Sequence, residues 1–214
     1  MEFTSNHVTK FYWILLLFMC LPLLAMKVIG CVLYLVVLGF AVRSMTSQVI
    51  VSGNRLTSKN IFKERTINIL PESRIYICRN MQSINFVLRF YDYSIKIVNP
   101  DETLKINANV NDADTLYQIV AGLEQKHILP VWLERFSNQP SLALDDNLTM
   151  TRNGIKYKNK VYLYDNLSGM KLESGYFRLM ANGKLWQTAL LALPVSAIPN
   201  IVTFMTLMNQ VDIH

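Results

Sequence analysis

Residues 11–42 constrain the fold of this 214-residue chain most, because they contain only one charged residue, Lys27. Two apolar runs flank this lysine, at Phe11–Met26 and Val28–Val42. Each run is slightly shorter than the roughly 20 residues that a spanning helix needs, but neighbouring residues can extend both. The pattern predicts a transmembrane helical hairpin in residues 1–45, with a tight turn near Lys27.

One continuous helix is the first alternative, and it would place Lys27 near the bilayer centre at a cost of about 2.5 kcal/mol or more. A cleaved signal peptide is the second, and the second apolar run argues against it. Tyr12 and Trp13 carry rings that settle at membrane interfaces. We therefore expect Tyr12, Trp13, Lys27 and Arg43 to anchor the hairpin. The positive-inside rule predicts a multi-pass protein of the cell inner membrane, with both termini and the globular region in the cytoplasm.

The rest of the chain reads as two β-rich units joined by a linker. In residues 46–126, short strand-like stretches between turn formers end near Val110. An Asx cap within Asn111–Asp114 (NDAD) then opens a helix whose apolar face consists of Leu116, Ile119, Val120 and Leu123. Residues 127–146 contain two prolines and predict a linker with a short helix at Val131–Phe136.

Residues 147–214 repeat the order of strands followed by a helix. Strand-like stretches begin at Leu148, and Asn182–Gly183 predicts a two-residue hairpin turn. Ser196 is positioned to cap a final helix. The apolar stripe predicted for that helix is Ile201, Val202, Met205 and Met208. Each unit is therefore predicted to be several antiparallel strands closed by one C-terminal helix.

This order of elements, the N-terminal hairpin and the junction Leu193–Asn200 (LPVSAIPN) resemble bacterial membrane-anchored proteins with PH-like domains. The resemblance implies an α+β fold, in which a transmembrane hairpin precedes two PH-like units. The alternative fold is one continuous α+β domain.

A basic stretch at Lys156–Lys160 is the strongest candidate binding site. Alternation along a strand would point Lys156, Lys158 and Lys160 to one face, and Arg152 lies just before them. Such a patch would meet anionic lipid headgroups or an acidic partner. Phosphoinositide-binding PH domains use basic residues on their first two strands, so the resemblance implies the same role. The alternative is a solvated edge strand whose lysines discourage edge-to-edge pairing.

The net charge is +6, of which residues 147–214 carry +4. This modest charge comes without a nucleic-acid-binding motif, so we expect no nucleic-acid partner. The three histidines are scattered, and no metal-ligand spacing, phosphate-binding loop or nucleophile elbow is present. We expect no metal, no cofactor and no enzymatic activity.

These observations predict a membrane-anchored, non-enzymatic binding or scaffold protein that presents its PH-like units at the cytoplasmic membrane face. The expected partners are lipids of an anionic leaflet and a protein whose identity the sequence does not reveal. One alternative is an interaction subunit of a larger membrane protein complex, for which Gly30, Cys31 and Gly39 offer small residues for helix packing. Another is a membrane enzyme with an unrecognised site.

Overall fold

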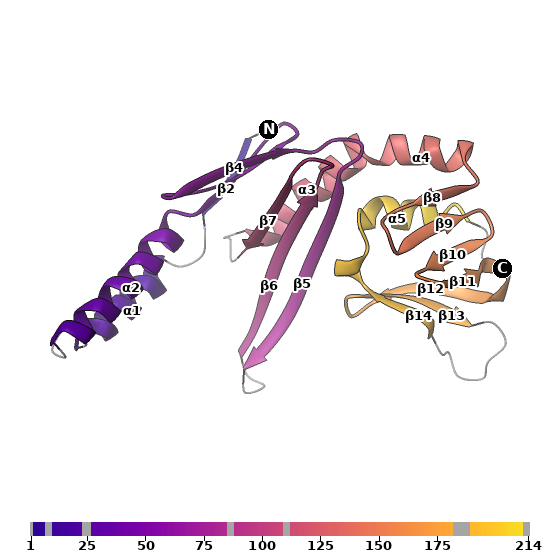
Figure 1. Cartoon of the computed structure of the whole chain (residues 1–214). Coiled ribbons are helices and arrows are strands. Elements are labelled where there is room, and N and C mark those ends of the chain that lie inside the picture. The colour runs from indigo at the N-terminus through magenta and orange to yellow at the C-terminus, as the bar shows by residue number, and fades with distance from the viewer. Residues whose placement is uncertain are drawn as a thin grey trace. The chain divides into compact units, whose positions relative to one another are not determined.

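The chain folds into two compact units (Figure 1). One comprises Met1–Asn68 and Ala108–Tyr117, and the other Ile69–Asn107 and Gln118–His214. The computed structural model describes residues 2–6, 10–22, 27–84, 88–108, 112–181 and 189–211. The hairpin turn predicted at Asn182–Gly183 lies outside these ranges, and the predicted division at residues 45, 126 and 146 stays a prediction.

The first unit contains a four-stranded antiparallel sheet in the order β1-β2-β3-β4, formed by β1 (Glu2–Asn6), β2 (Gln48–Ser52), β3 (Arg55–Asn60) and β4 (Lys63–Asn68). Val49 and Val51 are buried between more exposed neighbours, which is the period of a strand with one face in a core. The hydroxyl oxygens of Thr57 and Thr66 lie 2.9 Å apart on neighbouring strands. This cross-strand contact joins β3 to β4.

Two apolar helices, α1 (Lys10–Cys20) and α2 (Lys27–Met45), pack against each other in the same unit. Only Thr46 and Ser47 separate α2 from β2. The hydroxyls of both residues donate to the last turn of α2, from Thr46 Oγ1 to the Val42 oxygen at 2.8 Å and from Ser47 Oγ to the Arg43 oxygen at 2.7 Å. These bonds satisfy carbonyl groups that a helix end leaves unpaired.

The predicted transmembrane hairpin is not supported, because no helix in the described ranges is long and apolar enough to cross a membrane. At 1.5 Å per residue α1 extends about 16 Å, roughly half of the ~30 Å hydrocarbon core. The apolar run of α2 is confined between Lys27 and Arg43 and covers about 22 Å. The predicted multi-pass location in an inner membrane loses its basis with the hairpin.

The second unit begins with a three-stranded antiparallel sheet of β5 (Arg74–Ile84), β6 (Leu88–Val98) and β7 (Thr103–Ala108). β5 and β6 form a long hairpin whose register runs from Arg74 opposite Val98 to Ile84 opposite Leu88. The helix predicted to begin within residues 111–114 is confirmed as α3 (Ala113–His127). The predicted linker contains α4 (Leu129–Asn138), with Pro130 in its permissive first turn, and β8 (Ser141–Ala143).

Two further antiparallel sheets complete the second unit. One has the order β11-β10-β9-β8, with β9 (Leu148–Thr151), β10 (Gly154–Tyr157) and β11 (Lys160–Leu163). The other is formed by β12 (Leu167–Glu173), β13 (Tyr176–Ala181) and β14 (Ala189–Pro194). α5 (Ile201–Met208) is the last helix of the described chain.

The start and the buried face of α5 differ from the prediction. Residues 195–197 form a 3-10 turn, and Asn200 adopts a left-handed φ of 51°, so the helix begins at Ile201 rather than after Ser196. Its buried side chains include Phe204 and Leu207, whereas the predicted Met205 is only half-buried. The ring of Phe204 packs edge-to-face on that of Phe177, with 4.9 Å between centroids.

The side chain of Asn200 connects α5 to β5. Its Oδ1 accepts from the Ile75 amide at 2.8 Å, and its Nδ2 donates to the Ser73 oxygen at 2.9 Å. All three residues are buried. Asn200 therefore pairs two backbone groups that would otherwise be buried without partners.

These elements correct the predicted fold class. The described chain has helices mixed with four small antiparallel sheets, instead of a transmembrane hairpin followed by two PH-like units. The sequence reasoning failed because it grouped consecutive strands into two sets, whereas strand pairing divides them into four.

Candidate functional site

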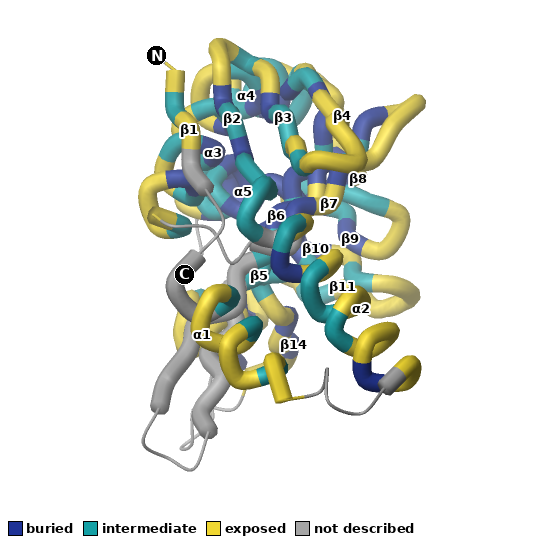
Figure 2. Tube along the Cα trace, turned by 90° about the vertical axis from the view of Figure 1, so that its left-hand side faces the viewer, coloured by how far each residue is buried: buried dark blue, intermediate teal, exposed yellow. Residues whose placement is uncertain are grey.

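The most unusual surface in the described chain is the helix pair α1 and α2, whose apolar side chains remain exposed. Val28 is 77% exposed, Ile29 71% and Phe40 58%. Figure 2 shows exposed and half-buried residues along most of both helices. The exposed large apolar side chains are Ile14, Leu15, Leu16, Phe18, Met19, Leu21, Val28, Ile29, Val32, Leu33, Leu35, Val36 and Phe40. We call this set the apolar helix surface.

A helix that packs on its own domain exposes a polar face, but α2 is apolar all round. Helices of that kind are normally covered by other structure. Contiguous exposed apolar surface beyond a few hundred Å² marks an interaction site. The apolar helix surface is therefore the candidate functional site of the first unit.

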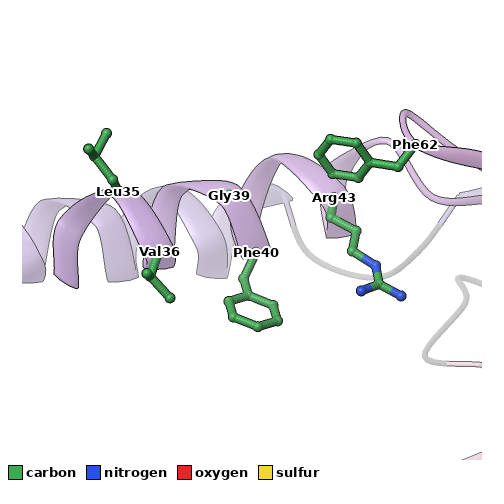
Figure 3. Close-up of a pocket in the computed structure, with 6 residues that line it drawn as sticks. All are labelled: Leu35, Val36, Gly39, Phe40, Arg43 and Phe62. Carbon is green, nitrogen blue, oxygen red and sulfur yellow. The ribbon is translucent and has the colours of Figure 1, made fainter. Parts of the chain in front are cut away.

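A shallow hollow of about 330 Å³ lies on this surface (Figure 3). It is lined by Leu35, Val36, Gly39, Phe40, Arg43 and Phe62. Val36 and Phe40 project from the same side of α2, and Phe62 reaches toward the Arg43 end of the helix from the β3–β4 turn. The hollow is therefore a mainly apolar surface with one positive charge, that of Arg43, at its end.

Hydrogen bonds hold the β3–β4 turn beside the end of α2. The Asn60 Oδ1 accepts from the amides of Phe62 and Lys63, each at 2.9 Å. The amide of Ile61 donates to Thr46 Oγ1 at 3.3 Å. Phe62, which the sequence reasoning did not single out, is thus presented in a defined position although its side chain is largely exposed.

The small residues of α2 leave room for another helix. A Cβ added at Gly39 would meet nothing within 4 Å, so this glycine is not required by the packing of its own chain. Glycine in a helix interior costs up to about 1 kcal/mol relative to alanine. Cys31 is exposed and carries a free thiol. Close approach by a neighbouring helix would account for glycine at this position.

The four predicted anchor residues all lie in or at the ends of these helices. Trp13 is half-buried. Arg43 is exposed at the C-terminal end of α2, where a positive charge interacts favourably with the helix dipole. The side chains of Tyr12 and Lys27 lie outside the part of the chain that the structure describes. Their predicted anchoring role depended on the transmembrane hairpin.

The predicted basic stretch does not form one face of one strand. β10 ends at Tyr157 and β11 begins at Lys160, so Lys158 lies in the intervening turn with a left-handed φ of 53°. Lys156 pairs with Val161 and Lys160 pairs with Tyr157, which places these two lysines on opposite faces of the hairpin. The three lysines lie on one hairpin but do not form an aligned row on one face. Their binding role stays a prediction.

The remaining predicted residue, Arg152, lies in the turn between β9 and β10. Its Nη2 donates to the Ser137 oxygen at 3.1 Å. This bond directs the guanidinium toward α4 rather than along the β10–β11 hairpin. The structure therefore separates Arg152 from the three lysines with which it was grouped.

A buried carboxyl group that the sequence reasoning missed lies between α3 and α5. Glu124 has no exposed surface, and its Oε1 accepts from the Thr203 amide at 2.6 Å. Burial raises the pKa of Glu124 to about 7, although the backbone amides of Thr203 and Val202 oppose the rise. Asn200, at the N-cap position of α5, makes no side-chain cap, so Glu124 caps this helix from a distant part of the chain.

The described residues contain no group of three or more His, Cys, Asp or Glu side chains that could hold a metal ion.

A model of the family of unknown function DUF6585 matches residues 7–214. The chain belongs to this family. The predicted resemblance to membrane-anchored proteins with PH-like domains is therefore wrong. No curated protein and no solved structure matches the chain.

Proposed function

We propose that this DUF6585 protein is a non-enzymatic binding protein that works in a self-assembled complex, with α1 and α2 of each copy packed against the same helices of another copy. The exposure of the apolar helix surface carries this proposal. Burial of apolar side chains is favourable by roughly 25 cal/mol per Å². An assembly that covers the two helices removes this surface from water.

The size of the surface suits a stable interface. The two helices contain 11 and 19 residues. One side of a stable protein interface uses roughly 20–30 residues and buries about 800 Å². The helix pair alone can therefore supply one side of such an interface.

A second copy is the occupant that the charge pattern favours. Between Lys27 and Arg43, α2 has no charged side chain, so its partner needs no matching charge. Every copy presents the same apolar surface at the same concentration, and two-fold interfaces between identical surfaces are the commonest form of assembly. The open space at Gly39 gives the second copy a point of close approach.

Light scattering on the purified full chain tests the proposal. We expect at least twice the 24.6 kDa of one chain at micromolar concentration. The double variant Val36→Glu/Phe40→Glu should weaken the assembly at least tenfold, because it places charge in an apolar interface. The matched control is Leu172→Glu, which makes the same kind of change at an exposed apolar residue of β12 in the other unit.

Two results would contradict the proposal. One is a single chain of 24.6 kDa at every concentration tested. The other is equal weakening by the double variant and by Leu172→Glu, because the assembly would then not depend on the helix pair.

A further inference from the structure

A pocket of about 340 Å³ lies in the second unit, and none of its lining residues belongs to the apolar helix surface. Four segments form its walls. They are α4 through Phe136, the β9–β10 turn through Arg152, residues 164–166 through Tyr164 and Asp165, and the end of α5 through Gln210 and Val211. Small-molecule sites in proteins occupy about 300–1,000 Å³, so the pocket is large enough for a compact ligand.

Hydrogen bonds to the backbone join three of the four walls. The amide of Tyr164 donates to the Asn153 oxygen at 2.9 Å, which joins residues 164–166 to the β9–β10 turn. The bond from Arg152 to Ser137 joins the same turn to α4 at 3.1 Å. The amide of Gln210 donates to Leu207 at 3.1 Å and continues the last turn of α5. The pocket is therefore formed by the fold itself.

The walls carry one charge of each sign beside apolar surface. Arg152 presents a guanidinium whose fork of donors matches a carboxylate, and one of its nitrogens already bonds Ser137. Asp165 supplies an exposed carboxylate on the next wall. Phe136 and Val211 supply apolar contacts. This combination complements a small molecule that also carries both charges and an apolar part.

Tyr164 forms part of one wall of the pocket as a buried residue. The residue is only 3% exposed, and its hydroxyl has no hydrogen-bond partner within the described chain. A buried hydroxyl without a partner costs about 1–3 kcal/mol, and phenylalanine would fill the same space without this cost. Burial also raises the pKa of Tyr164. The hydroxyl oxygen is itself inaccessible, so the polar contacts that the pocket offers come from its other lining residues.

We propose that this pocket binds a small zwitterion of the α-amino-acid type. The carboxylate of the ligand pairs with the Arg152 guanidinium. The ligand ammonium pairs with the Asp165 carboxylate, and its apolar side chain packs against Phe136 and Val211. The inference is independent of the assembly of α1 and α2, because every residue named here belongs to the second unit.

Titration calorimetry of the full chain tests this site with L-leucine and two matched analogues. 4-Methylpentanoate lacks the ammonium group of leucine, and 3-methylbutylamine lacks its carboxylate. We expect L-leucine to bind at least tenfold more tightly than either analogue, because each analogue leaves one charged wall without a counter-ion. Failure of L-leucine to bind at millimolar concentration, or equal binding of the analogues, would overturn the proposal.

Variants then locate the site. Arg152→Gln and Asp165→Asn should each weaken leucine binding at least tenfold. Lys156→Gln and Asp101→Asn make the same charge changes at exposed residues that do not line the pocket, and they should leave binding unchanged. Since Arg152 also supports the β9–β10 turn, Asp165→Asn decides the outcome if Arg152→Gln unfolds. Equal effects of Asp165→Asn and Asp101→Asn would exclude this pocket as the site.

Discussion

Replacing Glu124 by glutamine should remove one pH-dependent part of the folding stability. Below pH 4.5 the Glu124 carboxyl is protonated in both the folded and the unfolded chain. Between pH 4.5 and about 7 the folded chain holds this proton and the unfolded chain releases it. The free energy of unfolding therefore falls as the pH rises through this window. The difference between 4.5 and about 7 corresponds to about 3 kcal/mol.

Glutamine keeps an oxygen that can accept from the Thr203 amide, but it does not titrate. Urea unfolding of the wild type and of Glu124→Gln between pH 4.5 and pH 8 measures the effect, with the difference between the two proteins plotted against pH. We expect the wild type to lose about 3 kcal/mol relative to the variant over this range. Glu134→Gln is the control, because Glu134 is exposed on α4.

Two results would refute this reasoning. If the curves of the wild type and Glu124→Gln run parallel, Glu124 does not hold a proton in the folded chain at neutral pH. If the wild type instead gains stability relative to the variant as the pH rises, the bond from the Thr203 amide outweighs the burial of the charge. A pH-dependent difference of equal size for Glu134→Gln would also remove the assignment.

Further predictions concern the folding of the second unit and are each measured by urea unfolding. Gly154→Ala should lower the free energy of unfolding by about 1–3 kcal/mol, because a Cβ there collides with the backbone oxygen of Tyr162. Gly122→Ala, in open space on α3, should raise it by up to about 1 kcal/mol. Equal effects of the two substitutions would contradict this prediction. Asn200→Ala should lose about 2–5 kcal/mol by leaving two buried backbone groups without partners, and a loss under 1 kcal/mol would show that other groups replace its side chain. Trp132→Phe should lose about 1 kcal/mol with the 3.1 Å bond from its Nε1 to the Pro71 oxygen, and no loss would mean that this bond adds nothing to stability.

Local patterns in the sequence predicted several elements correctly. The apolar spacing of Leu116 and Val120 predicted α3, and both side chains are buried. One of the short strand-like stretches predicted within residues 46–126 corresponds to β2. Such patterns succeed because helix and strand periods depend on neighbouring residues alone.

The basic stretch shows where local reasoning failed. Lys156–Lys160 reads as one alternating strand, but the chain turns back at Lys158, so the faces of Lys156 and Lys160 are set by pairing with Val161 and Tyr157. The neighbouring strand therefore decides the conformation of this stretch.

The sequence by itself determined the apolar character of α1 and α2, the helix α3 and the lack of a recognised catalytic motif. Only the tertiary structure decided which distant residues meet. Thr203 bonds Glu124 across 79 positions, and Asn200 bonds Ser73 across 127. The pocket that includes Arg152 and Tyr164 likewise forms only when four separate segments fold together. Local periodicity carries no record of these contacts, because they form only when packing brings separate elements into one core.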